Sequence, residues 1–336
     1  MSTEKRPLFR FGVIADIQHA DIDDATNFGG TETRAYRGVL SEAVKAVDCW
    51  NRVEDPPIKF VAQLGDLVDG QNAGEYGQGL NFEEPQSDKA LGRVLEVLEK
   101  ADDSTMYFHA IGNHELYNFN WERLTTLLNK PGRHKVSEEG KFYFSFKPHP
   151  MWKIIMLNPY EVSVMQHEES EGYKEAANLL NQHNPNDVLG KQGSVNYFEG
   201  LEGDKLRYVP FNGGIGSEQM KWFKTEVLAS KEKNEKVIIL SHLPLHHGSC
   251  SHRNVAFNSP DILSFIQTEG KGVVSLVLAG HAHRGGYHEC EHSGIHHLTV
   301  QSPLSNGESH GVVSVFHDRV ELKGHGALPS RILSFY

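Results

Sequence analysis

Five short segments of the chain carry the carboxylate, amide and imidazole groups that bind divalent metal ions. They are Asp16-Ile17-Gln18, Gly65-Asp66-Leu67-Val68-Asp69, Gly112-Asn113-His114-Glu115, Ser241-His242 and Gly280-His281-Ala282-His283. Together they hold enough ligands for two adjacent ions. Two cations about 3.5–4 Å apart need a bridging carboxylate, and they can hold a bridging water as hydroxide at neutral pH. Asp66 is the natural bridge, and such a site indicates hydrolysis of a phosphate ester or anhydride.

The donor types narrow the choice of metal. Neutral and charged oxygen ligands come from Asp16, Gln18, Asp66 and Asn113, and imidazole nitrogens come from His242, His281 and His283. A mixed oxygen and nitrogen set suits Mn, Fe, Zn or, less comfortably, Mg.

The spacing within two segments predicts which side chains point together. Side chains at positions i and i+2 of a strand face the same way. We therefore expect Asp16 and Gln18 to reach one ion while His19 points elsewhere, and we expect His281 and His283 to lie side by side.

The elements that must position these groups are strands, because each segment follows an apolar, β-prone run. The runs are residues 8–15, 58–64, 105–111, 236–240 and 272–279. Segments with helical periodicity lie between several of these runs. One covers residues 33–50, and two others follow possible caps at Ser87 and Ser217. This alternation predicts βαβ units with parallel strands. In open α/β sheets ligands gather beyond the carboxyl ends of the strands, where all five segments fall.

Other regions complete the predicted domain. Residues 142–146 and 152–157 read as a hairpin, and the tail from residue 295 to residue 336 reads as further strands, which suggests a two-sheet sandwich. Residues 158–216 are long and polar, with a helix expected at about 174–180. A stretch of this length usually has a function, so we interpret it as an insertion near the substrate in a single domain spanning residues 1–336.

The motifs, in this order and spacing, resemble the metallophosphoesterase (calcineurin-like) superfamily from about residue 8 to about residue 325. The fold we expect is α/β, a four-layer α-β-β-α sandwich of two mixed sheets flanked by helices, with the metal site at strand carboxyl ends. The resemblance assigns one ion to Asp16, Gln18, Asp66 and His283, and the other to Asp66, Asn113, His242 and His281. It implies that His114 donates a hydrogen bond or proton to the phosphate or leaving group, and that Asp69 supports the site through hydrogen bonds.

Gln18 departs from the usual pattern, because the first motif of that superfamily is commonly Asp-x-His. An amide oxygen makes the ligand shell harder, which favours Mn or Mg over Zn or Fe. With Phe28, Asn72, Glu115-Leu-Tyr-Asn118 and Phe211-Asn-Gly-Gly214, the glutamine resembles the manganese-dependent ADP-ribose/CDP-alcohol diphosphatases. That resemblance implies cleavage of a nucleoside diphosphate linked to a sugar or alcohol, giving a nucleoside monophosphate and a phosphorylated second product.

A nucleotide base needs an aromatic stacking platform, and four residues are candidates: Phe28, Tyr117, Phe211 and Phe257. Phenylalanine is more often a core residue, so each candidate also has a structural interpretation. Two other functions stay open at this stage. The same core serves cyclic-nucleotide and other phosphodiesterases, and a non-catalytic scaffold could keep the fold, although the intact motifs argue against the scaffold.

Charge and composition limit the partners. The net charge of −11, from 44 acidic and 33 basic residues, gives no general attraction to nucleic acid or to an acidic membrane surface. Three widely spaced cysteines indicate no disulfide framework, and the chain has neither an apolar signal core nor a long apolar run. We expect a cytoplasmic monomer that acts on a small nucleotide conjugate.

Overall fold

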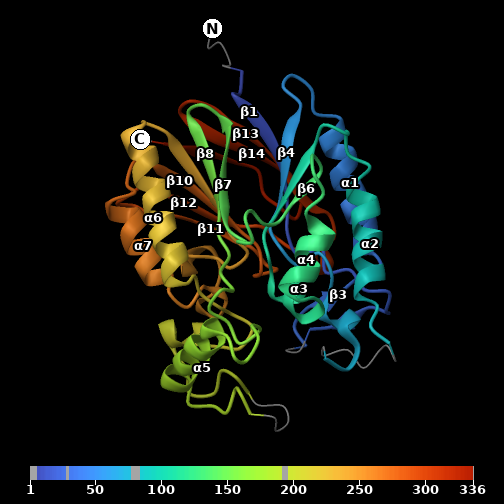
Figure 1. Ribbon diagram of the computed structural model, residues 1–336. Helices are drawn as coiled ribbons and strands as arrows, with labels where there is room; N and C mark the ends of the chain where they lie inside the picture. Colours follow the sequence, from blue (N-terminus) through green and yellow to red (C-terminus); the bar gives the residue numbers. More distant parts are fainter. Residues whose placement is uncertain (1–5, 28–29, 77–83, 191–195, 336) are drawn as a thin grey trace.

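The computed structural model describes residues 6–27, 30–76, 84–190 and 196–335. Two β-sheets lie face to face at its centre, with helices on both outer sides (Figure 1). This arrangement confirms the predicted four-layer sandwich of two mixed sheets. Among the described residues, no helix combines the length and the apolar character that a membrane crossing requires.

The first sheet has the strand order β15-β14-β13-β1-β4-β5-β6. Neighbours from β1 to β6 run parallel, whereas β13 runs antiparallel to β1. The strands are β1 (Phe9–Ile14), β4 (Ile58–Gln63), β5 (Met106–His109), β6 (His134–Lys135), β13 (Ser309–Val315), β14 (Arg319–Gly326) and β15 (Arg331–Ser334).

The second sheet has the order β11-β12-β10-β9-β8-β7. Its inner strands are parallel, and β7 pairs with β8 as the predicted antiparallel hairpin. The strands are β7 (Phe144–His149), β8 (Trp152–Met156), β9 (Lys236–Leu240), β10 (Val274–Ala279), β11 (Gly286–Glu289) and β12 (His296–Thr299). A separate short pair joins β2 (Ala25–Thr26) to β3 (Thr33–Arg34).

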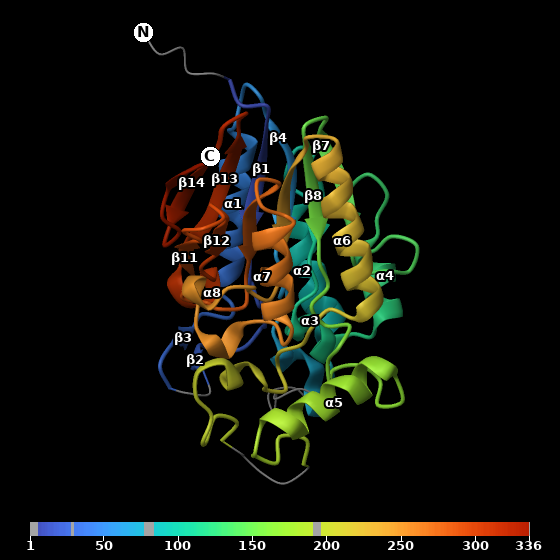
Figure 2. The same ribbon diagram turned by 90° about the vertical axis from the view of Figure 1, so that its left-hand side faces the viewer.

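Helices cover the outer face of each sheet (Figures 1 and 2). α1 (Val39–Asn51) and α2 (Ser87–Leu98) lie beside the first sheet, and α6 (Ser217–Glu232) and α7 (Ser259–Thr268) lie beside the second. The shorter helices are α3 (Asn113–Asn118), α4 (Trp121–Leu128), α5 (Glu171–His183) and α8 (Pro303–Asn306).

An apolar core fills the space between the two sheets. The rings of Phe11 and Phe60 stack at 4.8 Å between centroids, and Trp152 and Ile238 are fully buried in the same cluster. All six residues of β10 are buried. The continuous apolar run predicted such a strand, because a strand covered on both faces needs no alternation of polar residues.

Several predicted helix boundaries are wrong. Residues 33–34 belong to β3, so the helix expected over residues 33–50 begins at Val39. Ser87 and Ser217 are the first residues of their helices and not caps, and the capping positions are held by Gln86 and Gly216.

The segment 158–216 contains α5 and a short 3-10 helix at Gly203–Arg207. Both views place α5 beyond one end of the two sheets (Figures 1 and 2). Val162, Ala176 and Leu180 of the segment pack with Phe257, from a later part of the chain, in a small separate core. The interpretation of the segment as an insertion near the substrate stays a prediction.

Candidate metal centre

The seven predicted metal ligands all follow the carboxyl ends of strands. In the first sheet, Asp16 follows β1, Asp66 follows β4 and Asn113 follows β5. In the second sheet, His242 follows β9 and His281 follows β10. The strands within each group are parallel neighbours, so both sheets deliver their side chains to one place.

The backbone at four of these positions is left-handed. φ is 53° at Asp16, 46° at Gln18, 59° at Asp66 and 66° at His281. Side chains with a Cβ seldom adopt this conformation, and it concentrates at functional sites. We predicted the orientation of Asp16 and Gln18 from the alternation of side chains along a strand, and this reasoning is wrong. Both residues lie beyond the end of β1 and have a left-handed backbone. His19 does point elsewhere, with its Nδ1 3.0 Å from the carbonyl of Tyr36.

Two glycines permit the close approach of these loops. A Cβ at Gly112 would lie 2.0 Å from Oδ1 of Asp66, and a Cβ at Gly65 would lie 2.3 Å from Nδ1 of His242. Both distances are far below van der Waals contact. Only glycine lets the backbone pass this near to the two side chains.

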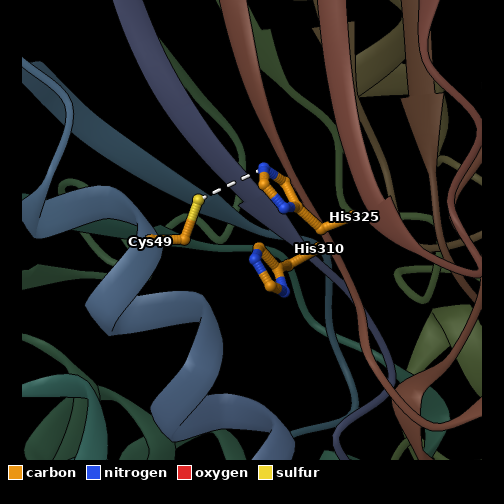
Figure 3. Close-up of side chains that lie close together, drawn as sticks. All are labelled: Cys49, His310 and His325. Atoms are coloured by element: carbon orange, nitrogen blue, oxygen red, sulfur yellow. Dashed lines mark hydrogen bonds between the residues drawn. The ribbon is translucent and has the colours of Figure 1, made fainter.

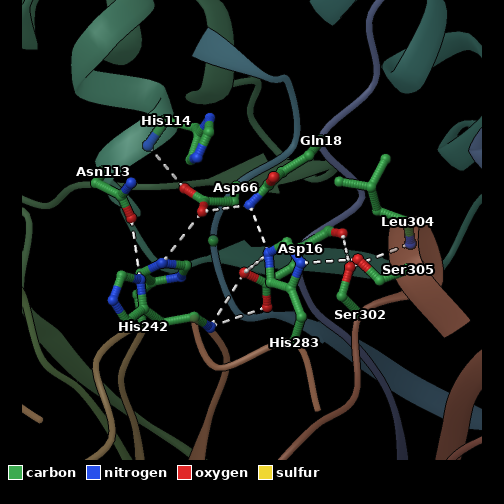
Figure 4. A network of polar contacts seen from close by, with 12 residues as sticks. Asp16, Gln18, Asp66, Asn113, His114, His242, His283, Ser302, Leu304 and Ser305 are labelled. Carbon is green, nitrogen blue, oxygen red and sulfur yellow. Dashed lines mark hydrogen bonds and ion pairs between the residues drawn. The ribbon is translucent and has the colours of Figure 1, made fainter. Parts of the chain in front are cut away.

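Asp66 lies at the centre of the polar network (Figure 4). Its Oδ1 accepts a hydrogen bond of 2.8 Å from the backbone amide of His114. Its Oδ2 lies 2.9 Å from Nε2 of Gln18 and 3.3 Å from Nε2 of His242. One carboxylate thus faces donors from both sheets, which is the position that a bridging ligand requires.

One side of Asp66 gathers Gln18, His283 and Asp16. Nε2 of Gln18 lies 3.0 Å from Nε2 of His283, which in turn lies 3.8 Å from Oδ1 of Asp16. The opposite side gathers Asn113 and His281, whose Oδ1 and Nδ1 atoms are 3.1 Å apart. The two predicted ligand sets are therefore spatially distinct and share Asp66.

Backbone and hydroxyl groups fix the orientation of two imidazoles. Nδ1 of His242 lies 2.7 Å from the carbonyl of Leu64 and donates a hydrogen bond to it, which leaves Nε2 as the atom that can bind a metal ion. Nδ1 of His283 lies 3.1 Å from Oγ of Ser305. Both rings thus present Nε2 towards the carboxylates of the centre, as metal-binding histidines do.

The residues fit divalent cations. Nε2 of His242 and Oε1 of Gln18 are buried and have no hydrogen-bond partner in the described part of the chain. A rotation of the side-chain amide of Gln18 by half a turn would exchange its oxygen and nitrogen. Oε1 would then face Asp66 and His283. Leaving buried polar atoms unpaired is costly, and cations at these positions would satisfy them.

The electrostatics of the buried carboxylates also suit cations. Burial raises the pKa of Asp16 well above its usual value, and the nearby Asp66 adds to the effect. Burial alone would raise the pKa of Asp66 too, but the imidazoles of His242 and His114 hold it below its usual range. Burial lowers the pKa of His242, yet Asp66 and Asp16 reverse this effect and raise it to about 9. The site thus concentrates negative charge that only cations or imidazolium groups can offset.

His114 lies beside Asp66 and outside both ligand sets. Its Nδ1 accepts a hydrogen bond of 2.8 Å from the amide of Gly70 and lies 3.4 Å from Oδ2 of Asp69. Asp69 also lies 3.6 Å from Arg34. Asp69 is thus close to His114, and its predicted role in supporting the site through hydrogen bonds stays a prediction.

Three residues that the prediction did not single out complete the centre. The carboxylate of Glu115 accepts hydrogen bonds of 2.7, 2.6 and 2.8 Å from the amides of Asp66, Leu67 and Gly112. The hydroxyl of Tyr160 donates to Asn113 at 3.3 Å, and Oδ1 of Asn212 lies 3.1 Å from Nε2 of His281. A glutamate at the third position of a helix is a known capping signal, which would have identified Glu115.

The aromatic candidates differ in their accessibility. The half-buried ring of Phe211 lies 5.9 Å from that of His281, and the half-buried ring of Tyr117 lies 5.2 Å from that of His114. Phe257 is only 3% exposed and packs in the small separate core that includes residues of the 158–216 segment, so its ring has no free face for a base. Phe28 lies outside the described residues.

Comparison with known proteins identifies the family to which this chain belongs. The family model described as calcineurin-like phosphoesterase matches residues 9–285. The chain belongs to the calcineurin-like metallophosphoesterases. This metallophosphoesterase is 34% identical to a manganese-dependent ADP-ribose/CDP-alcohol diphosphatase of Bos taurus, over 99% of the chain and 96% of that protein. It is 32% identical to a protein of the same name from Arabidopsis thaliana, over 98% of each chain.

A solved structure shares the fold of this metallophosphoesterase. The crystal structure of a dimetal phosphatase from Danio rerio superposes with a TM-score of 0.85 at 30% identity, covering 98% of this chain and all of that chain. The similarity therefore extends from the first sheet to the second and includes the loops that carry the candidate ligands.

Proposed function

We propose that this metallophosphoesterase hydrolyses the pyrophosphate of nucleoside diphosphate conjugates such as ADP-ribose, CDP-choline or CDP-glycerol. The products would be a nucleoside monophosphate and a phosphorylated sugar or alcohol. The observation that carries the proposal is the carboxylate of Asp66, which faces donors from both sheets, together with near full-length similarity to diphosphatases of that activity.

Two divalent cations, with Mn expected for activity, would be held by Asp66 and the six other predicted ligands around it. Asp16, Gln18, Asp66 and His283 would form one site, and Asp66, Asn113, His242 and His281 the other. Bound there, the cations would lower the pKa of a water molecule and offset the charge on the phosphate oxygens.

The chain itself contributes orientation and a proton donor. Because the amide of Gly70 occupies the lone pair of Nδ1, neutral His114 carries its proton on Nε2. That proton would form a hydrogen bond with a phosphate oxygen or with the leaving group. Leu64 and Ser305 hold His242 and His283 in place, so the donor set needs little reorganisation when substrate binds.

Substrate recognition would fall to the loops of the 158–216 segment. This segment supplies Tyr160 and Asn212, which contact the centre directly, and Phe211, whose ring lies beside His281. We propose that Phe211 and Tyr117 offer faces on which the base or ribose of the substrate packs.

We further propose that the protein is a cytoplasmic monomer. All three cysteines are free thiols, which suits a reducing compartment. Size-exclusion chromatography with light scattering tests the oligomeric state, and a stable dimer would contradict it.

The decisive experiment is a substrate panel of ADP-ribose, CDP-choline and cyclic AMP assayed with Mn, Mg and Zn. We expect turnover of the first two with Mn, and an Asp66→Asn variant should lose it while an exposed control, Asp103→Asn, keeps it. Turnover of cyclic AMP alone would favour a phosphodiesterase. Failure to bind metal or to turn over any substrate would indicate a scaffold.

A further inference from the structure

A second group of metal-binding side chains lies outside the metal centre already described. Cys49 comes from α1, His310 from β13 and His325 from β14 (Figure 3). Sγ of Cys49 lies 3.3 Å from Nε2 of His325, and the two imidazole rings stack with centroids 4.8 Å apart. One donor atom from each residue can be chosen so that all three lie within 4.8 Å of one another. A helix and a hairpin that is distant from it in sequence thus bring one thiol and two imidazoles together.

The buried ring of His310 is the second observation that points to a metal ion in this cluster. His310 is 1% exposed, and neither of its ring nitrogens has a hydrogen-bond partner among the described residues. Leaving two such nitrogens without partners in a core costs free energy that a valine or leucine would avoid. A metal ion that accepts the lone pair of one of these nitrogens would reduce this cost.

The cluster is open to ions from solvent. Cys49 and His325 line a surface cavity of about 550 Å³, which Glu308, Asp48, Lys45 and Lys323 also line. Oε1 of Glu308 lies 3.9 Å from Nε2 of His310. This carboxylate adds negative charge beside the cluster, although its oxygens do not lie within 4.8 Å of all three donor atoms.

We propose that Cys49, His310 and His325 form a zinc site, with a fourth position that faces the cavity. In a tetrahedral zinc site, sulfur and nitrogen ligands lie about 3.5 Å apart, because Zn–S and Zn–N bonds are about 2.3 and 2.0 Å. The separation of 3.3 Å between Cys49 and His325 is close to this value.

The ligand chemistry of this site differs from that of the metal centre around Asp66. A thiolate with two imidazoles favours a borderline or soft ion such as Zn, whereas the seven predicted ligands of that centre include no sulfur. Binding would break the S–H bond of Cys49 and form a Zn–S bond, and the proton would pass to solvent. The ion would join α1 to the β13–β14 hairpin.

Cobalt titration of the metal-free, full-length protein tests the proposal. Co²⁺ replaces Zn²⁺ in tetrahedral sites, and a thiolate ligand adds a sulfur-to-cobalt charge-transfer band in the near ultraviolet. We expect this band in the wild-type protein, its loss in Cys49→Ser and its retention in Cys290→Ser. Cys290 is the matched control because it lies near His246 and His288 in the other group that contains a cysteine.

The absence of the band from the wild-type protein would overturn the proposal, as would its persistence in Cys49→Ser. The half-buried His325 gives a second variant if Cys49→Ser does not fold. His325→Asn should weaken cobalt binding at least tenfold, and an unchanged titration would also overturn the proposal. Zinc added to the wild-type protein should displace the cobalt and abolish the band.

Discussion

The backbone amide of Gly70 donates a hydrogen bond of 2.8 Å to Nδ1 of His114. This contact fixes the tautomer of a neutral imidazole, because the nitrogen that accepts cannot carry the proton. Oδ2 of Asp69 lies 3.4 Å from the same nitrogen and has no hydrogen-bond partner among the described residues. His114 thus presents an N–H group without being one of the proposed metal ligands.

Replacing His114 by alanine should therefore separate catalysis from metal binding. We expect kcat to fall by about 100-fold or more, the usual range for a lost proton donor, while the affinity for Mn changes little. Steady-state kinetics and calorimetric Mn titration measure the two effects. His292→Ala, at an exposed histidine, is the control. A parallel loss of metal affinity would show that His114 is a ligand.

Gln18 should decide the metal preference. Gln18→His replaces an amide oxygen with an imidazole nitrogen next to Asp66 and His283, which shifts the shell towards Zn and Fe. We expect the ratio of Mn-supported to Zn-supported activity to fall several-fold. The control is Gln182→His, which adds a histidine at an exposed position on α5. An unchanged metal profile would argue against Gln18 as a ligand.

Glu115 supports the loop that carries Asp66. Its buried carboxylate accepts from three backbone amides, whereas glutamine offers one acceptor oxygen and an NH₂ group that would face amide donors. We expect Glu115→Gln to lower the free energy of unfolding by roughly 2–4 kcal/mol and to weaken Mn binding. Urea denaturation measures the first effect. The exposed Glu122→Gln is the control, and equal stability of the two variants would contradict the prediction.

Phe211 should contribute to substrate affinity. Stacking on a base is worth about 1–3 kcal/mol, so Phe211→Ala should raise KM for ADP-ribose about 10-fold, with a smaller change in kcat. Phe211→Tyr keeps the ring and should restore the affinity. If KM is unchanged in the alanine variant, the ring only packs against Tyr197 and Phe198.

The sequence predicted the positions of the candidate ligands at strand ends better than it predicted the first residues and caps of the helices. Each apolar run ends where a strand ends, so the positions of Asp66 and His242 followed from the polar residues after β4 and β9. Ser87 was misassigned as a cap because its hydroxyl donates to Asn118 at 2.7 Å. That bond depends on tertiary packing, which local propensity does not report.

The contacts from the 158–216 segment could not be predicted for a similar reason. Tyr160 reaches Asn113, and Asn212 reaches His281, across large separations in sequence. Neither residue stands in a motif with regular spacing. Only the folded loops show that this segment contacts two of the candidate metal ligands.

A buried histidine pair away from this centre should make stability depend on pH. Nε2 of His109 lies 2.9 Å from Nδ1 of His134, and both rings are buried. Burial lowers the pKa of His134 to about 4, although Glu99 opposes the effect, and burial also lowers the pKa of His109 well below its usual value. In the unfolded chain both titrate near 6.5.

Because the unfolded state binds more protons than the folded state between pH 6.5 and 4, folding stability must fall as the pH decreases through this window. His134 alone should account for a loss of roughly 3 kcal/mol. Urea denaturation at several pH values measures the slope. In His134→Asn the slope should be smaller, whereas the exposed His292→Asn should follow the wild-type curve. Parallel curves for His134→Asn and the wild type would show that the pair is not the source, since all other titrating groups are common to both proteins.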